Sequence, residues 1–125
     1  MDEKSEHLAE RTEDFAIDIV RRFEKLPLTV PAQTFGKQLI RSGSSVGAHY
    51  AEAQHSRSND EFVAKVDGAK QEAQESIFWL RLISRLQCVP ESSVLPLMEE
   101  ASQIRAILIS ISAHARKRNF GGTKT

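Results

Sequence analysis

This chain has little of what crosslinks or interrupts many proteins, with one cysteine, four prolines and six glycines in 125 residues. A single cysteine excludes an intrachain disulfide, and the low proline and glycine content argues against a disordered or collagen-like chain. Charge of one sign is also missing, because 17 Lys and Arg balance 17 Asp and Glu. No overall field therefore directs the molecule to nucleic acid or to an anionic membrane. No apolar run approaches membrane-spanning length, so we expect a cytoplasmic protein with no membrane partner.

Aromatic residues are also few. The main pattern in the sequence is the recurrence of apolar residues at alternating spacings of three and four. Such spacing keeps residues on one face of a helix. It occurs in four segments, at residues 6–25, 32–55, 59–87 and 94–118. Because no segment alternates like a strand and the connections are short, we predict an all-α, antiparallel up-down-up-down four-helix bundle. Residues 1–118 are expected to form a single domain, and residues 119–125, with two adjacent glycines, a flexible C-terminal tail.

The second and third segments indicate a tightly packed helical hairpin. Ser58 and Glu61 have the spacing of a capping box, in which each side chain accepts a hydrogen bond from the amide of the other residue. Upstream, small residues are dense at 41–48 and include a Gly43-x-x-x-Gly47 row. This row is expected to allow close approach at the hairpin seam. Pro90 ends the third segment, and Ser92 or Ser93 is expected to cap the fourth.

Two segments carry more apolar surface than one bundle can bury. Residues 106–111 are apolar nearly all the way round, and a helix of that kind is buried on more than one side. The third segment has a second stripe that contains the only tryptophan. Since large apolar patches rarely stay exposed, we predict self-association, and the alternative is that these residues only widen the core. The predicted oligomer interface consists of Trp79, Leu82, Leu86, Ile107 and Ile109.

Basic residues occur at positions that an up-and-down bundle brings to one end of the molecule. They are Arg21, Arg22, Lys25, Lys37, Arg81 and Arg85. Together they form a candidate phosphate-binding surface for RNA or DNA. The alternative is structural, because the helix dipole also favours cations at helix C-termini. The aromatic platforms that usually accompany single-strand binding are not expected here.

A metal site is a further alternative. Glu52 and His55 have the Glu-x-x-His spacing of ferritin-like bundles, but such sites need a second pair and two more inward glutamates. The chain has no second Glu-x-x-His pair, and His55 is expected at a helix end, where the dipole favours a cation. We therefore predict no metal and no cofactor, and a metal-binding bundle is the least favoured function.

Several stretches of the chain resemble one family. Residues 38–53, Gln-Leu-Ile-Arg-Ser-Gly-Ser-Ser-Val-Gly-Ala-His-Tyr-Ala-Glu-Ala, resemble the second-helix signature of bacterial four-helix bundle proteins first noticed in intervening sequences of 23S ribosomal RNA genes. Residues 60–66 and 69–83 resemble the third helix of that family, and residues 99–108 resemble its fourth. The resemblance covers nearly the whole chain and implies a homopentamer. A related branch, the accessory proteins of diversity-generating retroelements, is strongly basic and binds nucleic acid and a reverse transcriptase, whereas this chain is neutral.

The family pattern also picks out five charged residues, which are Arg41, Glu52, Lys70, Glu72 and Glu75. We predict that they form a structural polar network that sets helix register or subunit pairing, because an unpaired buried charge is costly. The alternative is that they are solvated charges with partners one turn away. His49 stands where the family usually has Asn, so a polar contact made by that Asn is in doubt in this chain.

No combination of residues predicts catalysis. Glu72 and Glu75 lie one turn apart, which suits acid–base chemistry, but no nucleophile or orienting histidine accompanies them on that segment. We predict a non-enzymatic, oligomeric interaction or scaffold protein that associates with RNA, DNA or a nucleic-acid enzyme through its basic end. The alternative is a purely protein-binding assembly with no nucleic-acid role.

Overall fold

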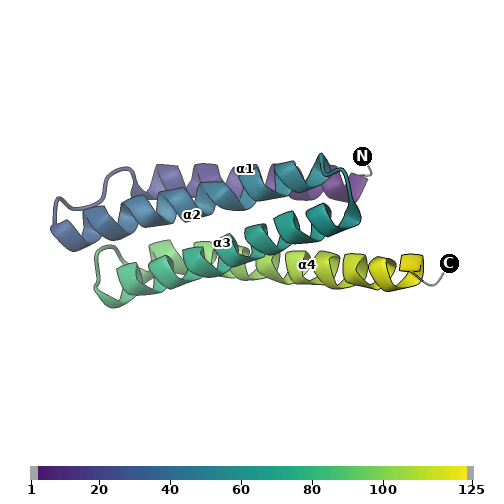
Figure 1. The fold of residues 1–125 in the computed structure, drawn as a ribbon. Coiled ribbons are helices and arrows are strands. Elements are labelled where there is room, and N and C mark those ends of the chain that lie inside the picture. Colours follow the sequence, from purple (N-terminus) through teal and green to yellow (C-terminus); the bar gives the residue numbers. More distant parts are fainter. Residues whose placement is uncertain (1–2, 124–125) are drawn as a thin grey trace.

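A computed structural model describes the backbone of residues 3–123 and the side chains of residues 7–118. The chain forms α1 (Glu3–Phe23), α2 (Val30–Gln54), α3 (Asn59–Arg85) and α4 (Glu91–Thr123), and the described residues contain no strand. Successive helices run in opposite directions (Figure 1). Helix α1 packs on α2 and α4, and α3 also packs on α2 and α4. The predicted all-α, up-down-up-down four-helix bundle is therefore confirmed.

Side-chain caps determine where α2 and α3 begin. Thr29 Oγ1 accepts a hydrogen bond from the Ala32 amide at 3.3 Å, and Ser58 Oγ accepts one from the Glu61 amide at 3.1 Å. Each cap satisfies an amide that has no partner within its helix. The second half of the predicted capping box is wrong, because the Glu61 carboxylate accepts from the Arg57 amide, at 3.3 Å, instead of the Ser58 amide.

The fourth helix is longer at both ends than its pattern predicts. It begins at Glu91, so Ser92 and Ser93 lie in its first turn and do not cap it. It ends at Thr123, so the helix end predicted at residue 118 is also wrong. A helix that has formed adds residues easily, and each glycine costs only about 1 kcal/mol relative to alanine. Residues 124–125 of the predicted tail lie outside the described residues.

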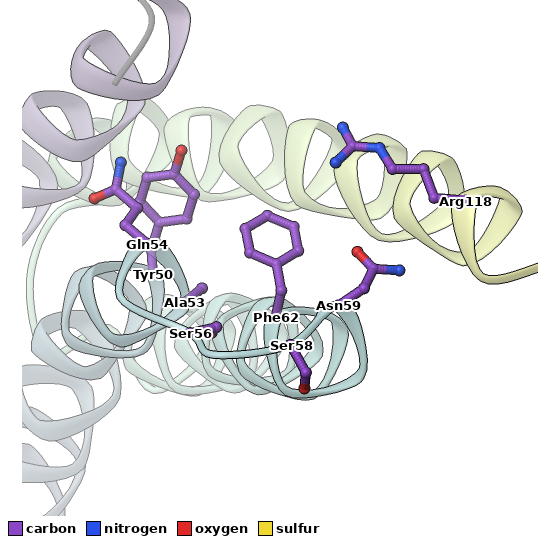
Figure 2. A pocket seen from close by; sticks show the side chains of 8 residues that line it. All are labelled: Tyr50, Ala53, Gln54, Ser56, Ser58, Asn59, Phe62 and Arg118. Atoms are coloured by element: carbon purple, nitrogen blue, oxygen red, sulfur yellow. The ribbon is translucent and has the colours of Figure 1, made fainter. Parts of the chain in front are cut away.

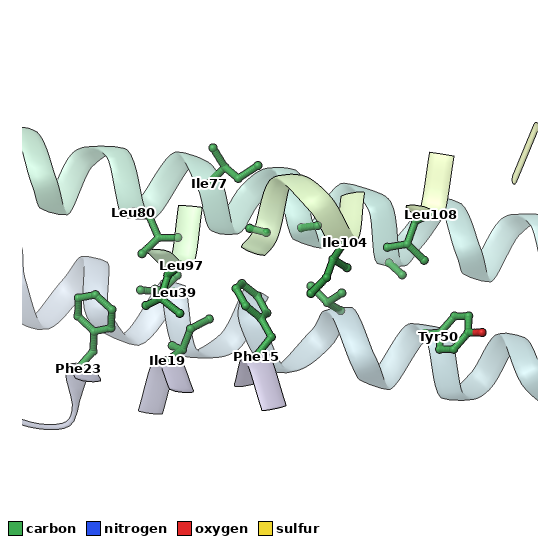
Figure 3. Close-up of a cluster of buried hydrophobic side chains, with 14 of the residues drawn as sticks. Phe15, Ile19, Phe23, Leu39, Tyr50, Ile77, Leu80, Leu97, Ile104 and Leu108 are labelled. Carbon is green, nitrogen blue, oxygen red and sulfur yellow. The ribbon is translucent and has the colours of Figure 1, made fainter. Parts of the chain in front are cut away.

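The core follows the bundle axis and is built from the apolar stripe of every helix. Figure 3 shows Phe15 and Ile19 of α1, Leu39 of α2, Leu80 of α3 and Ile104 of α4 directed into the space between the helices, and all five are fully buried. Burying a side chain of this size contributes about 1.5–3 kcal/mol to the free energy of folding.

No helix in the described part of the chain is long and apolar enough to cross a membrane.

The glycine row of α2 faces α1, which corrects its predicted place at the α2–α3 seam. A Cβ on Gly47 would lie 2.9 Å from Thr12 Oγ1, and one on Gly43 would overlap another side chain of α1. The α2–α3 seam instead contains Ser42 and Ser76, whose hydroxyl oxygens are 2.9 Å apart and buried. The error has a simple cause, because spacing identifies a face of a helix but not the neighbour that meets it.

Candidate interaction surfaces

One end of the bundle collects cations from three helices. The C-termini of α1 and α3 and the start of α2 lie at this end (Figure 1). Its exposed basic side chains, called the basic pole below, are Arg21, Arg22, Lys25, Lys37, Arg81 and Arg85. The predicted convergence of these residues at one end follows directly from the up-and-down topology.

The cations of the basic pole are not neutralised by the protein itself. Among the described residues, none of the six forms an ion pair, and the one polar contact is a long hydrogen bond of 3.5 Å from Arg22 Nη1 to the carbonyl of Ser93. The carboxylates of Glu24 and Glu91 are exposed at the same end without pairing with them. These cations therefore keep their charge accessible to an anionic partner.

Several cations elsewhere in the bundle are paired. Arg11 Nε lies 2.7 Å from a carboxylate oxygen of Glu100, which links α1 to α4. Lys65 Nζ lies 2.7 Å from Glu52 Oε2, which links α3 to α2. The hydrogen bond between Lys65 and Glu52 lowers the pKa of the Glu52 carboxyl and raises that of the Lys65 ammonium.

A charged cluster that the sequence interpretation missed joins α3 to α4 around Asp67. The Asp67 carboxylate accepts from Ser112 Oγ at 2.6 Å, pairs with Arg116 and lies 3.5 Å from Lys70 Nζ. Burial acts to raise the pKa of Asp67, but the Ser112 hydrogen bond and the charges of Lys70 and Arg116 outweigh it and lower that pKa. Finding this cluster from sequence requires the register between α3 and α4.

The predicted polar network separates into different contacts. Arg41 Nη1 lies 3.2 Å from Glu72 Oε2, and Arg41 also pairs with Glu75, so these three residues are brought together. Glu52 and Lys70 are not part of this group, because Glu52 pairs with Lys65 and Lys70 pairs with Asp67, as described above. Arg41 remains about half exposed, so in the single chain the group lies at the surface.

An aromatic cluster lies beside this group, on the outer side of α2 and α3. Trp79 is partly buried and stacks on Phe35 with ring centroids 5.7 Å apart, and its Nε1 donates to Glu75 Oε2 at 3.1 Å. Phe78 meets Trp79 edge-on at 5.0 Å and is 48% exposed. Phe78 precedes Arg81 by one turn of α3, so an exposed aromatic ring lies near the basic residues, which the sequence interpretation did not anticipate.

The residues of the predicted oligomer interface occupy two places. Trp79, Leu82 and Leu86 follow α3 toward the basic pole, and Leu86 is 55% exposed. Ile107 and Ile109 lie in the middle of α4, where Ile107 packs against the core and Ile109 is 39% exposed. The structure thus separates the predicted interface into one group at the C-terminal half of α3 and its cap and another in the middle of α4.

The end opposite the basic pole is hollowed by a pocket of about 340 Å³. Figure 2 shows Tyr50, Phe62 and Arg118 around it, from α2, α3 and α4 respectively. The Asn59 side-chain amide donates to the carbonyl of Ala115 at 2.8 Å and ties the start of α3 to α4 at this pocket. Arg57 and Lys117 are exposed in the same region, where acidic residues occupy the first turn of α3, and neither side chain pairs with another described one.

Two further predictions concern histidines. His55 and Glu52 line a shallow pocket of about 460 Å³ together with Lys65, and in the described part of the chain no three His, Cys, Asp or Glu side chains converge as metal ligands. His49 packs on Gly68, where a Cβ would lie 3.0 Å from its Nδ1, and this nitrogen is buried without a hydrogen-bond partner. His49 therefore fills the space left by the missing side chain of Gly68, between α2 and α3.

The fold and its exposed side chains define the class of this protein. It is a four-helix bundle with charged and aromatic side chains on the outside of its helices. The chain belongs to the 23S rRNA-intervening sequence protein family, whose model matches residues 5–110, as the resemblance predicted. It is similar to the crystal structure of a protein of unknown function from the S23 ribosomal protein family of Bacteroides thetaiotaomicron, with 29% identity and a TM-score of 0.78. That match covers 88% of this chain and 98% of the other. No curated protein matches the chain.

Proposed function

We propose that this protein is a non-enzymatic, oligomeric adaptor that binds RNA or DNA through its basic pole. One observation carries the proposal, namely that six exposed cations meet at one end of the bundle and none of them is ion-paired with another described residue. Lys and Arg residues that are free to contact phosphates release counterions from nucleic acid, which supplies most of non-specific affinity. A molecule with no net charge can therefore still present a local phosphate-binding surface.

The helix dipole accounts for only part of this arrangement. Arg21 and Arg22 lie in the last turn of α1, and Arg85 lies in the last turn of α3, where the dipole favours cations. Lys37 is different, because it lies about two turns into α2, beyond the region in which a helix end acts. Its presence beside the other cations favours a shared ligand over separate helix-end effects.

Self-association would multiply this surface. The apolar side chains of Trp79, Leu82 and Leu86 on the outer side of α3 support a contact between copies, and the family resemblance implies a homopentamer. In a closed ring every subunit presents the same surface in an equivalent position, so five copies would place five basic poles around one axis. Multivalent contact of this kind raises the overall affinity for a long polymer.

Charge reversal at the basic pole tests nucleic-acid binding. The triple variant Arg21→Glu, Arg22→Glu and Arg85→Glu should lose on the order of 100-fold or more in affinity for 23S ribosomal RNA fragments, and its salt slope should fall by about 3, or one per lost phosphate contact. Binding is measured by fluorescence anisotropy over a range of salt concentrations. The matched control is Arg57→Glu with Lys117→Glu, which reverses unpaired cations at the opposite end. Equal losses in both variants, or none in the triple variant, would discard the proposal.

Light scattering tests self-association separately. Trp79→Ala and Leu82→Glu should each yield smaller species while the helical circular dichroism is largely kept. Because Trp79 also packs on Phe35, the melting temperature of each variant is measured alongside its mass. Variants that fold and keep the parent mass would show that this part of α3 is not the contact between copies.

A second candidate function is a purely protein-binding assembly, and the turn between α1 and α2 favours it. Leu28 in the turn is 95% exposed and Val30, the first residue of α2, is 80% exposed, and apolar side chains that gather at a surface can mark an interaction site. Under this alternative, a partner purified on the wild-type protein is released by Leu28→Ser with Val30→Ser, and nucleic-acid affinity is negligible. Purification that returns no partner sensitive to these changes counts against it.

A further inference from the structure

One outward face of α3 combines an exposed aromatic ring with unpaired arginines. Phe78, Arg81 and Arg85 are spaced at i, i+3 and i+7, which places them in a row on one side of a helix. Gln74 precedes the row by one turn and is exposed as well. Phe78 is 48% exposed, and an aromatic ring of this size is usually covered in a folded protein.

The charge of this row is entirely positive. From residue 71 to residue 85, the two glutamates of α3 are Glu72 and Glu75, and both are directed toward α2, where they pair with Arg41. Arg81 and Arg85 have neither an ion pair nor a hydrogen bond among the described side chains. A polyanion lying along the row would therefore meet two free guanidinium groups without a nearby carboxylate on the same face.

The neighbouring helix adds another cation beside the row. The contact between Asp67 and Ser112 sets the antiparallel register of α3 and α4. Arg105 lies about two turns before Ser112, and Gln74 lies about two turns after Asp67, so the two are placed beside each other. Arg105 is partly exposed and pairs with none of the side chains that the structure describes, and it extends the cationic row beyond the end that holds Phe78.

The position of the Phe78 ring is set by the aromatic cluster behind it. Trp79 stacks on Phe35, and the Phe78 ring meets Trp79 edge-on at an interplanar angle of 71°. Edge-to-face contacts of this kind stabilise one arrangement of the two rings. A ring that is held in place and half open to solvent can receive a flat ligand at little entropic cost.

We propose that single-stranded nucleic acid lies along this face of α3, with a base stacked on Phe78 and phosphates on Arg81 and Arg85. The inference rests on the proposed function and narrows its ligand from nucleic acid in general to a single strand. An unpaired base exposes its π-face to an aromatic side chain, whereas the bases of a duplex are stacked on one another. Trp79 and Leu82, on the adjacent side of α3, remain the surface for contact between copies.

The experiment compares a fluorescent single strand with a duplex of the same length, using the full-length chain. Phe78→Ala should weaken single-strand binding about 10-fold or more, because each base stacked on an aromatic contributes strongly, and should leave duplex binding and the salt slope unchanged. Phe78→Tyr should restore single-strand affinity. Ile17→Ala is the matched control, because Ile17 is similarly exposed, at 47%, and lies on α1, which packs on α2 and α4 and not on α3 in the described part of the chain.

The outcomes separate this inference from the proposed function. Binding that depends on Arg21, Arg22 and Arg85 but is unaffected by Phe78→Ala overturns the inference and leaves the function standing. A smaller particle for Phe78→Ala in light scattering would assign Phe78 to the contact between copies and also overturn it. If the wild-type chain binds neither single strands nor duplexes, the proposed function fails and the inference fails with it.

Discussion

The basic pole and the α3–α4 junction around Asp67 use their charges in opposite ways. At the junction, Lys70 and Arg116 share one carboxylate that also accepts a hydroxyl hydrogen bond. At the basic pole, Arg81 and Arg85 on the same helix pair with nothing in the described part of the chain. Charges of the first kind act on stability, whereas charges of the second kind stay exposed to solvent, and the proposed function uses only these. The same residue type on one helix can therefore have either role, depending on whether a neighbouring helix supplies a carboxylate.

The largest effect on stability is expected from Asp67→Ala. This change leaves the nearly buried Ser112 hydroxyl without its acceptor and Arg116 without its carboxylate, which should cost about 1–3 kcal/mol of the free energy of unfolding. Urea titration followed by circular dichroism measures the loss. A variant as stable as the wild type would show that the junction does not hold α3 to α4, and the contrast between the two regions would disappear.

A smaller effect is expected from acid. Because the pKa of Asp67 is lowered in the folded state, its contribution is present above the unfolded pKa of about 3.9 and is lost as the pH falls through the folded pKa. The advantage of the wild type over Asp67→Asn in unfolding free energy should thus shrink below about pH 4. Denaturant titrations at pH 7 and pH 3 test this, and an advantage that does not change between them would contradict it.

A substitution in the turn between α3 and α4, at the basic pole, should increase the free energy of unfolding. Gln87 has φ of 55°, and the amide of Cys88 donates to the carbonyl of Ile83 at 3.1 Å, which together form a Schellman motif. Glycine adopts this backbone conformation without a Cβ penalty, so Gln87→Gly should stabilise the protein by about 0.5–1 kcal/mol. The change in thermal midpoint measures it, and a decrease would mean that the Gln87 side chain contributes more than its strained backbone costs.

The smallest effect is expected where charges are unpaired. Arg81→Gln and Lys37→Gln should each change the free energy of unfolding by no more than about 0.5 kcal/mol, because neither loses an ion pair. Both variants should nevertheless bind nucleic acid more weakly under the proposed function. Stability losses as large as that of Asp67→Ala would identify the basic pole as a structural element.

The fold could be predicted well from local features of the chain. The apolar spacing of α1 and α3, the Ser58 cap and the turn at Pro90 all act within a few residues, so the helices and their order follow from neighbouring positions. One error occurred where a second helix decides the outcome, because the Gly43 and Gly47 row meets α1 and not α3, and spacing alone does not encode that choice. The other error is local, because α4 continues past residue 118 to Thr123 where the two glycines had indicated a helix end.

The candidate surfaces were predicted less completely. The basic pole follows from helix order, because an up-and-down topology brings Arg21, Lys37 and Arg85 to one end. Whether these cations are paired could not be read from sequence, and neither could the exposure of Phe78. Glu52 and Lys70 were assigned to one network with Arg41, but their partners are Lys65 and Asp67. Long side chains choose among several carboxylates within reach, and that choice depends on register.

The amino-acid sequence by itself determined the number of helices, their order, their buried stripes and the end at which the basic residues gather. These properties depend on contacts within one helix or one turn, where the separation of two residues along the chain determines their relative positions in three dimensions. Only the tertiary structure decided which charges are neutralised, which helix meets the glycines and which aromatic ring stays open to solvent. Those outcomes depend on the rotation and register of one helix against another, which arise from the packing of all four together.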